Sequence, residues 1–317
     1  MNVLSPRAKF AGIYRPIAGH KIPSKTPLAF TLVELLVVIA IIVIMMALIG
    51  PAMNALKGAN DMDKAADDIS SMFQLCRTYA IANNTYVYLG LGEFDSSISE
   101  TGPQITGSNT GGRLAMFAIA SKDGTRHYSP FDASLKEVQQ DWNKTGNDPT
   151  IGYQKGAGFI AITKLQHYEN LHMFSYGQKP PTTGPMARVS IVDNFHLLGD
   201  TQSDTLTPIT YPLATTTSGS TTALYTFSKT IQFDPSGMVR MAPKGAPTTS
   251  SSSTVPYSPN GIIDWMEVGL IQTHGNIIPT AALTAIQGNP NSGNHLCLLV
   301  DGIKGTVRIL RPGKPNL

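Results

Sequence analysis

The chain has few charged residues, and almost no cysteine or tryptophan. Of its 317 residues only 14% are charged, and the formal net charge is +3. This small charge argues against general nucleic-acid binding, which depends on neutralising many phosphates with Lys and Arg. Gly, Pro, Ser and Thr are abundant instead. Such a composition is typical of a loop-rich β protein outside the cytoplasm.

Enzyme and nucleotide-binding motifs are also missing. The sequence has no HExxH, no CxxC and no P-loop. Asp264 and Asp301 could contribute to a calcium site, but acids in turns are far commoner than calcium ligands. We therefore predict that the protein is not an enzyme, and we expect no catalytic residue, cofactor or metal.

Cys76 and Cys297 are the only cysteines. Outside the cytoplasm two thiols could pair, and the bond would close a loop of more than two hundred residues. Both cysteines also lie in apolar contexts, where Cys is often simply a buried side chain. The sequence leaves both readings open.

One long apolar segment lies near the N-terminus. Residues 30–53 hold a single carboxylate, Glu34, among side chains that are almost all apolar. At about 1.5 Å per residue this segment gives roughly 35 Å of helix, enough to cross a hydrocarbon core of about 30 Å. A lone acid there costs on the order of 2.5–3.5 kcal/mol, so its presence needs a reason.

A basic leader precedes the apolar segment. It contains no acid and five basic residues, namely Arg7, Lys9, Arg15, Lys21 and Lys25. Such a flank predicts a cytoplasmic N-terminus, with the residues after 53 outside the membrane. A plain single-span anchor with a chance acid would look similar.

The residues Ala29-Phe30-Thr31-Leu32-Val33-Glu34, followed by the apolar run, resemble the class III signal of type IV pilins and of the pseudopilins of type II secretion. The resemblance implies cleavage between Ala29 and Phe30 by a prepilin peptidase and N-methylation of Phe30. It also implies that Glu34 guides assembly. The family usually has Gly at the position of Ala29.

The same resemblance implies a helix kink at Pro51. A proline inside a helix removes one hydrogen bond and bends the helix, although Gly50-Pro51 could instead end it. A helical pattern resumes after Pro51 as an apolar stripe with steps of three or four residues, formed by Ala66, Ile69, Phe73, Cys76 and Ala80.

Short segments rich in strand-favouring residues follow this helix. They comprise 85–91, 114–120, 158–163, 187–191, 224–227, 230–233, 237–241, 296–300 and 306–310. Turns are predicted at 234–237 and 301–305, and weaker helices at 134–142 and 279–286. Ser- and Thr-rich stretches at 200–220 and 248–254 are expected to be loops.

These observations predict an α+β, pilin-like fold, in which a long N-terminal helix packs on an antiparallel β-sheet head. We expect a basic cytoplasmic leader over 1–29, a transmembrane and assembly helix over 30–53, and an amphipathic continuation of that helix over 54–84. An extracytoplasmic β-rich head with Ser/Thr-rich loops would occupy 85–317.

The segments 66–89, 233–237 and 305–309 resemble type H minor pseudopilins, whereas 92–222 has no counterpart. The resemblance implies a minor pseudopilin, a structural subunit of a type II secretion-like pseudopilus used in protein transport. It would be a single-pass protein of the bacterial inner membrane. Its partners would be the prepilin peptidase, other pilin-like subunits, the inner-membrane assembly platform and the membrane, with no nucleic acid. The alternative is a minor type IV pilin whose head adheres to surfaces or captures DNA.

Overall fold

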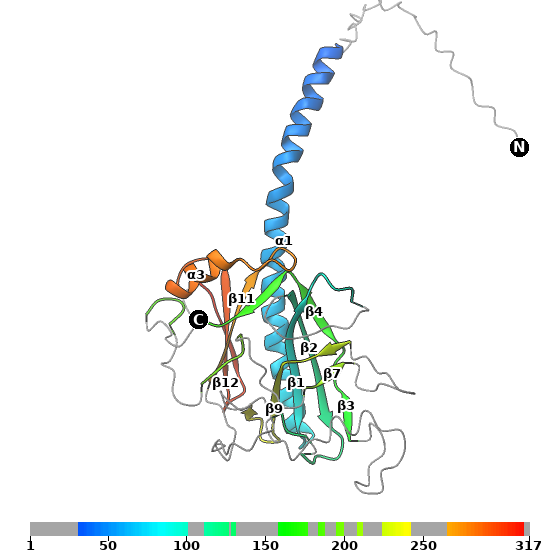
Figure 1. The fold of residues 1–317 in the computed structure, drawn as a ribbon, viewed down its shortest axis with the longest axis vertical. Helices are drawn as coiled ribbons and strands as arrows, with labels where there is room; N and C mark the ends of the chain where they lie inside the picture. Colours follow the sequence, from blue (N-terminus) through cyan, green and yellow to red (C-terminus); the bar gives the residue numbers. More distant parts are fainter. Residues whose placement is uncertain are drawn as a thin grey trace, which may run out of the picture. The chain divides into compact units, whose positions relative to one another are not determined.

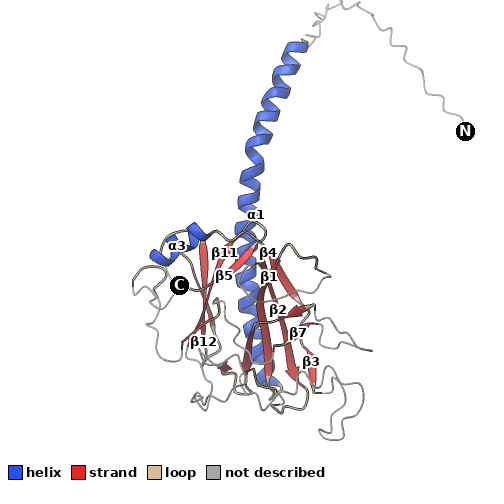
Figure 2. Cartoon of the chain, viewed as in Figure 1, coloured by secondary structure: helices blue, strands red, loops and turns tan. Residues whose placement is uncertain are grey.

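The computed structural model describes residues 31–100, 111–126, 128–130, 158–176, 183–187, 195–199, 208–211, 224–241 and 265–313; for 48–60 and 195–197 it describes the backbone alone. The chain divides into two units, residues 1–52 and 53–317. The longest element, helix α1, covers Leu32–Ala82. The second unit consists mostly of antiparallel β-sheet (Figures 1 and 2).

The first sheet is built around two long neighbouring strands, β1 (Val87–Asp95) and β2 (Gly112–Ser121). They pair antiparallel from Val87↔Ala120 to Asp95↔Gly112. The order across the sheet is β10-β9-β1-β2-β3, and β4 also pairs with β2. The remaining strands are β3 (Phe159–Ala161), β4 (Gln166–Glu169), β9 (Lys229–Phe233) and β10 (Val239–Arg240).

The second sheet has the order β13-β12-β11-β5, and β6 pairs with β11 in parallel. Its strands are β5 (Leu171–Phe174), β6 (Phe195–Leu197), β11 (Trp265–Gln272), β12 (His295–Asp301) and β13 (Val307–Leu310). Two short strands, β7 (Thr210–Tyr211) and β8 (Tyr225–Thr226), form a separate ribbon, and helix α3 covers Thr280–Gly288.

The C-terminal half of α1 supplies one wall of the main core. The predicted apolar stripe is buried, with Ala66 and Cys76 fully inaccessible to solvent. The same apolar cluster contains Leu89 from the first sheet and Leu298 from the second. This part of the helix therefore fills the core between residues of both sheets, because burying one stripe is how an amphipathic helix gains most of its stability.

Polar side chains of the helix also bind the sheet residues around the core. Tyr168 on β4 donates a hydrogen bond of 2.6 Å from its hydroxyl to Asp68 Oδ2. Burial, together with the charge of Asp68, raises the pKa of Tyr168. Arg311 binds Asp63 at 2.6 Å after the last strand. The two acids extend the packing of the helix beyond its apolar stripe.

The fold class predicted from the sequence is wrong as stated. The structure is mostly antiparallel sheet, and among the residues it describes no helix is both long and apolar enough to span a bilayer. A span needs about 20 apolar residues, and the apolar side chains described at the start of α1 end at Ala47. The predicted transmembrane helix and single-pass inner-membrane location are contradicted by the same finding.

The strands predicted at 85–91, 114–120, 158–163, 224–227, 230–233, 237–241, 296–300 and 306–310 are confirmed within a few residues, as is the helix at 279–286. Strands β4, β5, β6, β7 and β11 were not predicted. The helix at 134–142, most of the strand at 187–191 and the Ser/Thr-rich loop at 248–254 lie outside the described residues.

A glycine in a central strand of each sheet lies under an aromatic ring. A Cβ atom built on Gly90 of β1 would come within 2.8 Å of the Phe227 ring. One built on Gly269 of β11 would come within 2.6 Å of the ring of Phe174, its cross-strand neighbour on β5. The two rings pack directly on strand backbone at these places, which only glycine allows.

A buried carboxylate connects the two sheets. Glu93 of β1 has a fully buried side chain, and both of its oxygens lie 2.9 Å from Nδ1 of His172 on β5. A carboxylate only accepts hydrogen bonds, so His172 Nδ1 carries the proton. The backbone N–H groups of Met173 and Gly112 donate to the same carboxylate at 2.9 and 3.1 Å. One side chain thus binds the backbone of β2 and two consecutive residues of β5.

Replacing Glu93 with Ala should lower the free energy of unfolding by about 3 kcal/mol, because it leaves a buried imidazole and two buried N–H groups without their acceptor. Urea unfolding followed by circular dichroism measures the change. Asp67→Ala, at an exposed position on α1, is the control and should stay within about 0.5 kcal/mol of the original protein. Equal midpoints for the Glu93 and Asp67 variants would contradict the connecting role of Glu93.

Candidate functional site

The start of α1 is held by a reciprocal pair of hydrogen bonds between Thr31 and Glu34. The Glu34 backbone N–H donates to Thr31 Oγ1 at 3.2 Å, and the Thr31 backbone N–H donates to Glu34 Oε2 at 2.8 Å. The Thr31 hydroxyl also donates to Glu34 Oε2, again at 2.8 Å. This arrangement is a capping box, which satisfies two N–H groups that a helix otherwise leaves without partners.

The capping box gives Glu34 a local role that the family resemblance did not suggest. The backbone hydrogen bond from Thr31, followed by the one from its hydroxyl, lowers the pKa of Glu34. The Thr-x-x-Glu spacing is visible in the sequence and was a readable signal for a helix start at Thr31. The carboxylate remains exposed to solvent, so it has room for a further partner.

The apolar side chains that follow Glu34 are exposed around the whole helix. Leu35, Leu36, Val37 and Val38 are 46–60% exposed, and four successive residues cover a full turn of an α-helix. The exposure continues to Met46, at 68%. A helix that packs on the surface of a globular protein buries one apolar stripe and exposes polar residues on the opposite side. This segment has no polar side.

Two predicted positions of the processing signal, Ala29 and Phe30, lie outside the described residues. Pro51 lies within α1, whose helical assignment continues through Gly50 and Pro51. The reading in which these two residues end the helix is therefore wrong. The kink itself stays a prediction.

The structure does not bring Cys76 and Cys297 into a disulfide. Both are thiols and both are fully buried. Cys76 lies in the main core with the stripe of α1, and Cys297 lies in a smaller cluster with Phe174 and Ile286. Burial raises the pKa of the Cys76 thiol, so it is kept from the reactive thiolate form. Of the two readings left open by the sequence, simple burial is correct.

The turn acid Asp301 also has a structural role. Its Oδ1 accepts the backbone N–H groups of Ile303 and Lys304 at 3.0 and 2.9 Å, and Gly305 N–H bonds to its carbonyl at 2.7 Å. The carboxylate therefore stabilises the predicted turn between β12 and β13. Asp264, the other residue considered for calcium, lies outside the described residues.

Comparison with known proteins gives no relative. No family model, no curated protein and no solved structure matches the chain. The resemblance of the N-terminal segment to the pilin signal therefore depends on the quoted residues alone.

Neither cysteine should react with a maleimide in the native protein at pH 8, because both sulfur atoms are buried and Cys76 is held protonated. Both should react in denaturant. Mass spectrometry of labelled protein counts the modified thiols before and after unfolding, and a reducing agent should leave the urea midpoint unchanged. A midpoint that falls on reduction would reveal a disulfide and contradict the structure.

Proposed function

We propose that this protein is a structural subunit of a fibre of the pseudopilus type, a minor pseudopilin of a type II secretion-like system. It would be cleaved before Phe30 by a prepilin peptidase and would assemble through the first half of α1. One observation carries the proposal. The apolar side chains from Leu32 to Met46 are exposed on every side of the helix.

The free energy of covering this helix favours polymerisation. Removing apolar surface from water gains roughly 25 cal/mol per Å², and each side chain of the segment offers about half of its surface or more. A second helix could cover only one stripe of this surface. A bundle of several like helices covers all of it, and a fibre built around such a bundle repeats the same contact for each added subunit.

Glu34 fits this proposal as the one charged group of the segment. In a bundle its carboxylate loses contact with water, and the capping box alone leaves its charge uncompensated. The family resemblance supplies a partner, the α-amino group that cleavage creates on Phe30 of a neighbouring subunit. A buried carboxylate is tolerated only when a positive charge pairs with it. The α-amino group of Phe30 exists only after cleavage, so Glu34 would select subunits that have been processed.

Processing is the first test. Protein purified from its native host should begin at Phe30, with a methylated α-amino group. N-terminal sequencing and mass spectrometry of the intact chain measure both features. Functional protein that retains residues 1–29 would contradict the proposed cleavage.

Assembly is the second test. Glu34→Leu should prevent incorporation, because a buried ion pair that loses one member typically costs about 3–5 kcal/mol. Crosslinking and co-purification with other pilin-like subunits, at matched protein levels, measure incorporation. Asp67→Asn removes an exposed acid further along the same helix and should have no effect.

Thr31→Ala separates the two roles of Glu34. It removes both hydrogen bonds made by the hydroxyl while keeping the carboxylate, and the loss of such a cap costs about 1 kcal/mol. Incorporation should therefore largely survive in Thr31→Ala and fail in Glu34→Leu. Equal loss in both variants would assign Glu34 to helix capping alone. Normal recovery of Glu34→Leu would remove its proposed role in assembly.

A further inference from the structure

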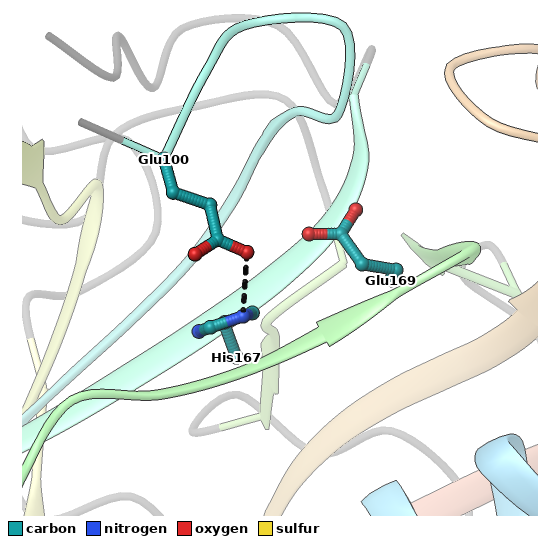
Figure 3. A group of neighbouring side chains, drawn as sticks. All are labelled: Glu100, His167 and Glu169. Atoms are coloured by element: carbon teal, nitrogen blue, oxygen red, sulfur yellow. Dashed lines mark ion pairs between the residues drawn. The ribbon is translucent and has the colours of Figure 1, made fainter. Parts of the chain in front are cut away.

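Three potential metal ligands meet on the surface of the second unit. Figure 3 shows the side chains of Glu100, His167 and Glu169 pointing toward one another. Each offers one ligand atom, and these atoms lie within 4.8 Å of each other. His167 Nε2 lies 3.2 Å from Glu100 Oε1. The spacing is that of groups able to share one ion.

Strand geometry places two of the three ligands side by side. His167 and Glu169 stand two residues apart on β4, and residues two apart on a strand project from the same face. Glu100 comes from the segment after β1, far from β4 in sequence. The cluster has no local motif, which is why the sequence alone predicted no metal site.

A buried arginine fixes both segments that carry the ligands. The side chain of Arg113 on β2 is 5% exposed, and its Nε binds Oε1 of Glu169, the cross-strand neighbour of Arg113. Its Nη1 donates to the carbonyl oxygen of Ile98 at 3.1 Å, two residues before Glu100. One guanidinium therefore holds β4 and the segment with Glu100 in place. Metal sites use such outer contacts to orient their ligands.

We propose that Glu100, His167 and Glu169 form a binding site for a divalent transition metal ion, with Zn²⁺ as the best-matched ion. An imidazole nitrogen with two carboxylate oxygens is a donor set that zinc accepts, whereas calcium and magnesium prefer oxygen ligands only. Three protein ligands leave a fourth tetrahedral position for water or for a group of another molecule. The side chains of His167 and Glu100 are 34% and 59% exposed, so an ion can reach the site from solvent. The proposal is independent of the assembly function proposed for α1.

Equilibrium dialysis of the full-length chain with Zn²⁺ tests the site. One ion should bind per chain, and His167→Gln and Glu100→Gln should each weaken binding at least tenfold, since loss of even an outer-shell partner typically costs 10–100-fold. His274→Gln changes an exposed histidine elsewhere in the second unit and should bind as the original protein does.

A parallel measurement with Ca²⁺ tests the ion class. The proposal expects calcium to bind far more weakly than zinc and to be insensitive to His167→Gln. The absence of saturable Zn²⁺ binding would overturn the site, as would equal zinc affinity of His167→Gln and His274→Gln. Calcium bound more tightly than zinc would overturn the assignment to a transition metal. Because the test does not involve assembly, its failure leaves the role of α1 untouched.

Discussion

The buried carboxylate of Glu93 is the contact on which the arrangement of the two sheets depends. It accepts hydrogen bonds from His172 and Met173 on β5 and from Gly112 at the start of β2. Apolar packing between sheets is tolerant of small slips, because dispersion and burial have little directionality. Three hydrogen-bond donors that converge on the two oxygens of one carboxylate do not allow such a slip. Glu93 therefore sets the register between sheets that α1 alone would leave adjustable.

Three other polar contacts of the second unit follow the same pattern. Arg113, Tyr168 and Arg311 each join segments far apart in the chain, and each does so through a carboxylate. Only 14% of the residues are charged, yet several of the described charges stand where two elements meet. In a chain with so few charges, such contacts decide which of many compact arrangements is adopted, while the apolar core supplies most of the free energy.

The sequence predicted local elements better than their assembly. The stripe through Ala66, Phe73 and Cys76 is a repeating pattern, so it predicted the buried face of α1 correctly. Strand β11 was missed although Met266, Val268 and Leu270 are buried and alternate with Glu267 and Gly269, a spacing that is visible in the sequence. The pairing of Glu93 with His172 joins residues 79 positions apart and has no sequence signature. The cluster around His167 was out of reach for the same reason. The membrane span was inferred from the apolar run over 30–53, the basic leader before it and the resemblance to the pilin signal, and the described helix does not bear it out.

The two glycines under aromatic rings limit how this fold can vary. At Gly90 and Gly269 the ring occupies the volume that a side chain would need. A related sequence could carry a larger residue at either position only if Phe227 or Phe174 became small at the same time. Substitutions at each glycine and at its aromatic partner are thus coupled, although the two residues are separated by many positions in the chain. An alignment of relatives should show the two members of each pair changing together, and that covariation would identify the fold where overall similarity is too low to detect.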